Sequence, residues 1–199
     1  MVSTALSDAE LVRKCQAGDW RAYNELVGRH QDRIFTLIYR YLGHWEDAGD
    51  VCQEVFLKAF RALPEFRGEA AFGTWLHRIA VNALISWRRK RQAQPAMPLD
   101  NRASGDGGDD QRPDPPDNSP GPAQVADSKE REAIIQRAIS GLDEEQRIVV
   151  VLRDVQGRDY EEIANILGCP RGTVKSRLHR ARLLLREKLR PLVHQEERK

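Results

Sequence analysis

The feature that most constrains the fold is the stretch 93–127, which cannot build a hydrophobic core. It holds seven prolines and four glycines, and seven aspartates oppose two arginines, so its net charge is −5. A segment with so little apolar surface cannot offset the conformational entropy lost on ordering. We therefore expect a disordered acidic tether at 93–127 between two small domains, one at 1–92 and the other at 128–199.

Every structured stretch of the first domain has the periodicity of a helix. Ser7 and Glu10 form a capping box, and Pro64 is expected to end a helix that begins near Trp45. After a loop, an apolar stripe runs from Phe72 to Trp87 and is followed by four consecutive cations. Apolar residues recur at steps of three and four in the two middle helices, first as Tyr23, Leu26, Val27, Ile34, Leu37, Ile38 and Tyr41, then as Ala48, Val51, Cys52, Val55, Ala59, Phe60 and Leu63.

The second domain also reads as helices, in shorter pieces. An acid stands three residues before a Glu or Gln at Asp127, Asp143 and Asp159, and each of these pairs is typical of a helix start. The last start opens the helix 160–167, which is followed by a Gly-Cys-Pro turn and a long helix from about Arg171. This spacing predicts a helix-turn-helix. The expected fold class is therefore all-α, with two helical domains.

The last helix separates its apolar and polar residues onto opposite faces. Between Pro170 and Arg190 it carries eight cations and one acid, for a local charge of +7. Clustered Lys and Arg on a helix favour binding to DNA, because phosphates release counterions and a helix fits the major groove. A solvated basic helix is the simpler alternative. The polar face is formed by Gly172, Lys175, Ser176, His179 and Arg180.

Two helices of the first domain carry polar residues that could bind partners. Acids in the first turn of the third helix are favoured by the helix dipole, but Asp50, Gln53 and Glu54 extend beyond its reach, which favours a protein partner. The fourth helix combines Trp75 with Asn82 and several cations, a set that suits unstacked bases. Core packing is the alternative for its tryptophans.

Several classes of function find no support in the sequence. Cys15, Cys52 and Cys169 are far apart and lack ligands at metal-binding spacing, so we expect reduced thiols, no metal and no cofactor. The N-terminus lacks a signal pattern, and no apolar run approaches the roughly 20 residues that span a bilayer. A cytoplasmic protein without membrane insertion is expected.

Five segments, in this order, resemble the extracytoplasmic-function sigma factors of bacterial RNA polymerase. The first domain resembles their region two through the segments DVCQEVF, FRG and WLHRIAVN at 50–56, 66–68 and 75–82. The second resembles their region four through YEEIA and GTVKSRL at 160–164 and 172–178. The resemblance covers both domains. It implies a monomeric, non-enzymatic initiation factor that binds core polymerase at the clamp coiled coil of the largest subunit and at the flap, and that is controlled by an anti-sigma factor.

The resemblance also implies a role for individual residues. Core polymerase would be bound by Asp50, Gln53, Glu54 and Phe56. The minus-ten element would be opened and bound by Arg67, Trp75, Arg78, Asn82, Arg88 and Arg89. The minus-thirty-five element would be read by Arg171, Thr173, Lys175, Ser176, Arg177, His179 and Arg180.

Two other classes of protein are weighed against this interpretation. A conventional helix-turn-helix regulator would bind duplex DNA without polymerase, but it would not need the segments of the first domain. A nuclease could use Asp50 and Glu54 as metal ligands, yet these carboxylates stand one helical turn apart without a third acid or histidine nearby in the sequence. Both alternatives are less favoured than the sigma factor.

Overall fold

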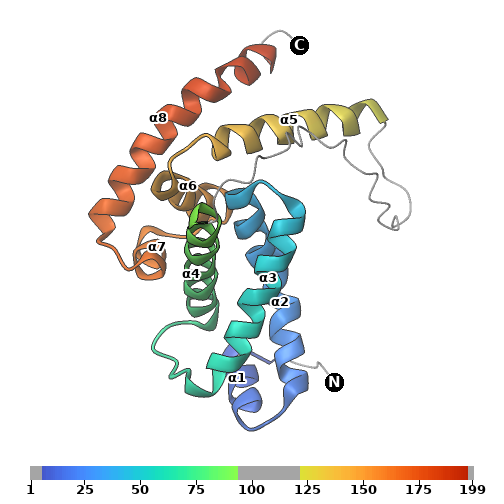
Figure 1. Ribbon diagram of the computed structural model, residues 1–199, viewed down its shortest axis with the longest axis vertical. Coiled ribbons are helices and arrows are strands. Elements are labelled where there is room, and N and C mark those ends of the chain that lie inside the picture. The colour runs from blue at the N-terminus through green and yellow to red at the C-terminus, as the bar shows by residue number, and fades with distance from the viewer. Residues whose placement is uncertain (1–5, 94–121, 197–199) are drawn as a thin grey trace.

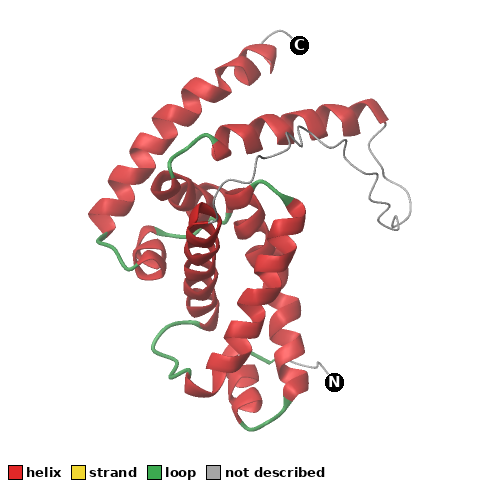
Figure 2. Ribbon diagram, in the orientation of Figure 1, coloured by secondary structure: helices red, strands yellow, loops and turns green. Residues whose placement is uncertain are grey.

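The computed structural model describes residues 6–93 and 122–196, with side chains for 6–92 and 130–190. The described residues form helices joined by short loops, without a strand (Figure 2), which confirms the all-α class. Most of the predicted tether, 94–121, lies outside the described residues. None of the described helices is both long and apolar enough to cross a membrane.

The first half of the chain contains α1 (Asp8–Gln16), α2 (Trp20–Leu42), α3 (Trp45–Ala62) and α4 (Phe72–Ala93), with the short 3-10 turn η1 (Leu63–Glu65) after α3. The capping box of Ser7 and Glu10 is formed as predicted. Gly43 ends α2 at φ 80°, a left-handed conformation that favours glycine. The buried residues of α2 and α3 pack against α4, and Leu11 and Val12 attach α1 to the same core.

The second half contains α5 (Pro122–Ser140), α6 (Glu144–Val150), the π-helical turn η2 (Val151–Val155), α7 (Tyr160–Leu167) and α8 (Arg171–Glu196). The predicted starts at Asp143 and Asp159 are confirmed as N-caps. The start at Asp127 is wrong, because α5 already begins at Pro122 and Asp127 lies within it. Proline suits the first turn of a helix, where its missing N–H needs no partner.

The two halves pack against each other. Figure 1 shows α4 and α7 side by side and α5 and α8 as two long arms that diverge from the region of α6, and residue contacts join α4 to α7 and α2 to α5. His77 of α4 is completely buried; its Nδ1 lies 2.6 Å from the carbonyl oxygen of Gly73 and its Nε2 lies 2.9 Å from Oε1 of Gln156. Gln156 in turn donates to the carbonyl of Arg33 in α2 at 2.6 Å.

A second group of polar contacts joins the end of α2 to the turn before α6. The guanidinium of Arg147 donates to the carbonyl of Tyr41 at 2.8 Å and to the carbonyl of Leu142 at 2.9 Å. Burial lowers the pKa of Arg147. Arg88 of α4 forms an ion pair with Glu144 at 2.7 Å. The described chain is therefore one closed body in which the halves share polar contacts.

Candidate nucleic-acid interface

The helix-turn-helix is built from α7 and α8. The side chain of Asp159 accepts from the backbone N–H of Glu162 at 2.8 Å, which completes the capping box of α7. Gly168 ends α7 at φ 63°, and Pro170 follows in the turn. The inner surface of the pair is fully apolar and consists of Ile163, Ile166, Val174, Leu178 and Ala181. This packing fixes which side of α8 is directed toward solvent.

The solvent side of α8 carries most of the residues predicted to read duplex DNA. Those with exposed side chains are Arg171, Lys175, Ser176, His179 and Arg180. Thr173 and Arg177 are half-buried, and Arg177 forms an ion pair with Glu145 of α6 at 2.7 Å. Arg177 therefore points toward the body of the protein, whereas the other cations of this set are exposed.

The loop between η1 and α4 encloses a pocket of about 300 Å³ with the first turns of α4. Arg67, Trp75 and Arg78, all predicted to bind nucleic acid, line it together with Glu65 and Glu69. The Trp75 ring lies 4.8 Å from the Phe66 ring, measured between centroids, and is tilted by 49°. The pocket thus combines an aromatic surface with two cations and two carboxylates, groups that can stack on a base and bond to its edge.

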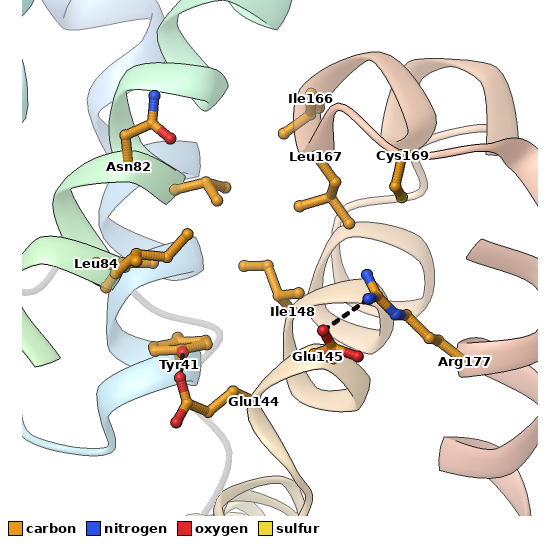
Figure 3. Close-up of a pocket in the computed structure, with 12 residues that line it drawn as sticks. Tyr41, Asn82, Leu84, Glu144, Glu145, Ile148, Ile166, Leu167, Cys169 and Arg177 are labelled. Atoms are coloured by element: carbon orange, nitrogen blue, oxygen red, sulfur yellow. Dashed lines mark hydrogen bonds and ion pairs between the residues drawn. The ribbon is translucent and has the colours of Figure 1, made fainter. Parts of the chain in front are cut away.

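Asn82 lies in a different cavity, one helical turn beyond Arg78. This larger cavity of about 420 Å³ lies between the two halves, with Asn82 and Leu84 of α4 on one side and Leu167, Cys169 and Arg177 on the other (Figure 3). Arg78 also contacts the second half, because its Nε donates to the carbonyl of Asn165 at 2.7 Å. In this conformation Arg78 therefore reaches α7, whereas the exposed Asn82 side chain lies at the edge of the cavity between the halves.

The end of α4 supplies the remaining predicted cations. Arg88 is half-buried through its ion pair with Glu144, whereas Arg89 is exposed. Arg91 is paired with Asp47 of α3 at 2.8 Å and lies over the Trp87 ring, 4.9 Å from its centroid. Of these three cations, Arg89 is exposed and forms no ion pair with another described residue.

The outer face of α3 carries the residues predicted to bind protein. Asp50 and Gln53 are exposed, while Glu54 is paired with Lys58 at 2.7 Å; this hydrogen bond lowers the pKa of Glu54. Phe56 is half-buried, and its carbonyl accepts a 2.6 Å hydrogen bond from the hydroxyl of Tyr23. Phe56 is therefore held partly within the bundle.

Two apolar residues on this face were missed by the sequence analysis. Leu57 and Phe60 are 50% and 51% exposed. The assignment of Phe60 to the inner stripe is wrong, because its ring packs against Tyr23 only at an edge, with centroids 5.0 Å apart. Spacing could have revealed the face, since the residues at i+3, i+7 and i+10 from Asp50 are Gln53, Leu57 and Phe60.

The cysteines show no sign of metal chemistry within the described residues. All three are free and half-buried, and burial raises the pKa of Cys52 to about 11. A thiol with so high a pKa carries little thiolate at neutral pH, and thiolate is the form that binds metals. The described part of the chain contains no cluster of three His, Cys, Asp or Glu side chains that could hold a metal ion.

Comparison with known proteins identifies the family. The chain matches sigma-70 region 2 over residues 26–94 and sigma-70 region 4 over residues 132–185. It is 39% identical over 196 residues to the ECF RNA polymerase sigma-E factor of Escherichia coli K12, which covers 96% of this chain and 99% of the relative. The chain belongs to the extracytoplasmic-function group of sigma-70 factors. As such it is a transcription initiation factor, and the stand-alone regulator is not favoured.

Further relatives agree with this assignment. The sigma-E factor of Haemophilus influenzae is 38% identical over 192 residues, which cover 94% of this chain and 98% of the relative. The structure of CnrH in complex with the cytosolic domain of CnrY has a TM-score of 0.66 at 25% identity, and covers 92% of this chain and 97% of CnrH. The fold also matches the Bartonella quintana sigma factor RpoE in complex with NepR, with a TM-score of 0.63 at 24% identity over 84% of this chain and 96% of RpoE.

The two matches divide the described structure at the contact between its halves. Region 2 spans α2 from Leu26, all of α3, and α4, so the pocket of Arg67, Trp75 and Arg78 belongs to it. Region 4 begins at Glu132 within α5 and continues through α6 and α7 to Leu185 in α8. Helix α1 lies outside both matches. The polar contacts of His77, Arg78 and Arg88 therefore join region 2 to region 4.

Proposed function

We propose that this sigma factor captures an unpaired base of the minus-ten element in the pocket formed by the loop after η1. The observation that carries the proposal is the gathering of Arg67, Trp75 and Arg78 around one pocket of about 300 Å³. A base extruded from the duplex can stack on the Trp75 ring while an arginine pairs with its phosphate or its edge. Asn82, Arg88 and Arg89 extend the same helix and would bind the neighbouring strand.

The exposed face of α8 reads the minus-thirty-five element as duplex in this proposal. Lys175, Ser176, His179 and Arg180 lie on one side of a helix whose other side is anchored in the apolar core. Such a helix can enter the major groove and direct Lys and Arg to guanine edges. Arg171 and Thr173 at its start would contact phosphates. Arg177 can join this set only when its ion pair with Glu145 breaks.

The outer face of α3 binds the clamp coiled coil of core polymerase in this proposal, and region 4 binds the flap. Asp50, Gln53 and Glu54 provide polar groups, while Leu57 and Phe60 add apolar surface that water would leave on binding. Phe56 supports the face through its partly buried ring. The protein acts by binding and positioning, without chemistry at its own residues, and it acts in the cytoplasm, where polymerase and promoter DNA meet.

Promoter binding requires the two regions to separate. In the closed conformation Arg78 is bonded to the carbonyl of Asn165, Arg88 is paired with Glu144, and Asn82 faces the helix-turn-helix across the cavity. These are groups that the minus-ten strand would need. Core polymerase, which would hold region 2 at α3 and region 4 elsewhere, can supply the free energy of separation as differential binding.

An anti-sigma factor is proposed as the regulator. Two of the matched structures are complexes, one of CnrH with the cytosolic domain of CnrY and one of the Bartonella quintana RpoE with the anti-sigma factor NepR. By likeness to CnrH and to the sigma-E factors, we expect a regulator that covers the outer face of α3 or stabilises the closed conformation. Either mode would keep the sigma factor from polymerase or from DNA.

In vitro transcription with purified core polymerase and a genomic promoter library tests the proposal. Addition of the chain should produce transcripts from a defined subset of promoters, and Trp75→Ala should reduce open complexes at them while Trp20→Ala, a change at an exposed tryptophan, should not. Permanganate footprinting of exposed thymines measures the opening. Promoter binding of equal strength without core polymerase, together with an absence of transcripts, would instead indicate a stand-alone regulator.

A further inference from the structure

Helix α1 lies outside both family matches, yet it contacts the base of the loop that forms the proposed base-capture pocket. Figure 1 shows α1 beside the turn that follows α3, and residue contacts join α1 both to η1 and to α4. Its own position is well fixed, because Leu11 is 1% exposed and the capping box of Ser7 and Glu10 defines its first turn. A helix anchored in this way can serve as a support for the loop.

The last residue of α1, Gln16, bridges the two sides of the turn at the start of the loop. Its Nε2 donates to the carbonyl of Leu63 at 3.1 Å and to the carbonyl of Phe66 at 2.9 Å. The Leu63 carbonyl also accepts the backbone N–H of Phe66 at 3.1 Å, so Gln16 reinforces the turn itself. The bond to the Phe66 carbonyl fixes the peptide plane that leads into Arg67.

Phe66 connects this turn to the floor of the pocket. Its ring lies 4.8 Å from Trp75 and 6.2 Å from Phe72, measured between centroids. A rotation of the backbone at Phe66 would therefore move an aromatic neighbour of Trp75 as well as the start of the Arg67 segment. The orientation of the pocket depends on the turn that Gln16 holds.

Helix α1 also supports the other end of the loop. Asp8 accepts from Arg29 at 3.0 Å and lies 2.6 Å from Nε2 of His30, and the His30 ring packs edge-on against Phe72 with centroids 5.3 Å apart. Burial raises the pKa of Asp8, but the bonds from His30 and Arg29 outweigh burial and leave the pKa below its ordinary value. Helix α1 therefore supports both ends of the loop, the start through Gln16 and the end through the contact of Asp8 with His30, which packs against Phe72.

We propose that Gln16 is a positioning residue for minus-ten recognition, which sets the loop conformation and thereby the base preference of the pocket without contacting DNA. The inference rests on the proposed function of that pocket. Because two hydrogen bonds are involved, their loss should lower the preference for the best minus-ten sequence over a scrambled one by about 5- to 140-fold.

The test compares four variants in holoenzyme made with core polymerase. Fork-junction DNAs with a randomised single-stranded minus-ten segment first identify the sequence that the wild type prefers, and the ratio of its affinity to that of a scrambled segment is then measured. Gln16→Glu keeps the shape but removes both donors, so the ratio should fall. Gln16→Lys retains donors and should keep it. Lys14→Gln changes the charge of the same helical turn by the same single unit and should leave the ratio unchanged, while Trp75→Ala should abolish it.

The outcomes separate the two claims. A ratio for Gln16→Glu equal to that of the wild type, while Trp75→Ala loses it, overturns the role of Gln16 and leaves the pocket intact. An unchanged ratio for Trp75→Ala overturns the pocket itself. A fall for Gln16→Glu that Gln16→Lys shares equally also contradicts the hydrogen-bonding argument. If Gln16→Glu loses helical signal in circular dichroism, Gln16→Met, which is uncharged and of similar length, replaces it in the same comparison.

Discussion

Replacement of Gln156 by alanine should shift this sigma factor from the closed conformation toward an open one. The Gln156 side chain joins region 4 to two groups of region 2, the His77 ring at 2.9 Å and the Arg33 carbonyl at 2.6 Å. A hydrogen bond contributes about 0.5–1.5 kcal/mol net, so two contribute about 1–3 kcal/mol. At 1.4 kcal/mol per tenfold change, the opening equilibrium should shift by about 5- to 140-fold.

Small-angle X-ray scattering and binding of single-stranded minus-ten DNA measure the shift. Gln156→Ala should increase the radius of gyration of the free chain and its affinity for the single strand, because Arg78 and Asn82 are released from the region 4 side of the contact. Gln31→Ala, at an exposed glutamine of α2, is the matched control and should change neither quantity. Scattering and affinity identical to those of the wild type would show that these bonds do not hold the closed conformation.

Three further predictions concern polymerase binding, promoter binding and pH. Leu57→Glu should weaken the pull-down of core polymerase by at least about tenfold with unchanged circular dichroism, since half of this apolar side chain is exposed on the outer face of α3. Lys175→Ala with Arg180→Ala should weaken closed-complex binding by about 1–3 kcal/mol per base contact in gel-shift assays. A pre-melted minus-ten bubble should rescue Asn82→Ala but not that double variant; equal failure of both would contradict the division of labour. Burial lowers the pKa of His77 more than its two oxygen neighbours raise it, so the opened or unfolded chain binds a proton near pH 6.5 that the closed form resists. The stability that neutral His77 contributes to the closed form is therefore fully present above pH 6.5 and is lost as the pH falls below it. Between pH 7.5 and 5.5 the melting temperature should drop by less in His77→Gln than in the wild type.

The helices could be predicted because local signals agree with the tertiary packing. The capping boxes at Ser7 and Asp159 and the left-handed Gly43 mark boundaries by short-range chemistry that the sequence displays directly. Asp127 carries the same signal three residues before Glu130, yet it lies inside α5, because a helix continues through an acid at little cost and Pro122 provides an equally good start. A capping box therefore marks a possible helix start, which need not be the one that the chain uses.

The individual residues of the candidate site could be predicted from the sequence, but not which of them share a pocket. The family resemblance named Arg67, Trp75, Arg78 and Asn82 together, and the structure gathers the first three around one pocket while Asn82 lines another. Helical spacing alone explains part of this, since Arg78 and Asn82 are one turn apart, but the loop conformation decides which of them its pocket includes. That conformation depends on hydrogen bonds from Gln16 to backbone carbonyls, for which no pattern of side chains in the sequence gives a signal.

The contact between the regions could not be predicted for a related reason. Three of its hydrogen bonds use the backbone carbonyls of Arg33, Tyr41 and Asn165. Every residue possesses a carbonyl, so the sequence does not mark these acceptors. The side chains that reach these carbonyls include Arg78, a residue proposed to bind the minus-ten strand. A cation that satisfies a carbonyl in the closed chain and a nucleic acid in the open complex couples the two states, because it cannot do both at once. Stronger DNA binding at this position would therefore also act against closure, and selection for one property changes the other.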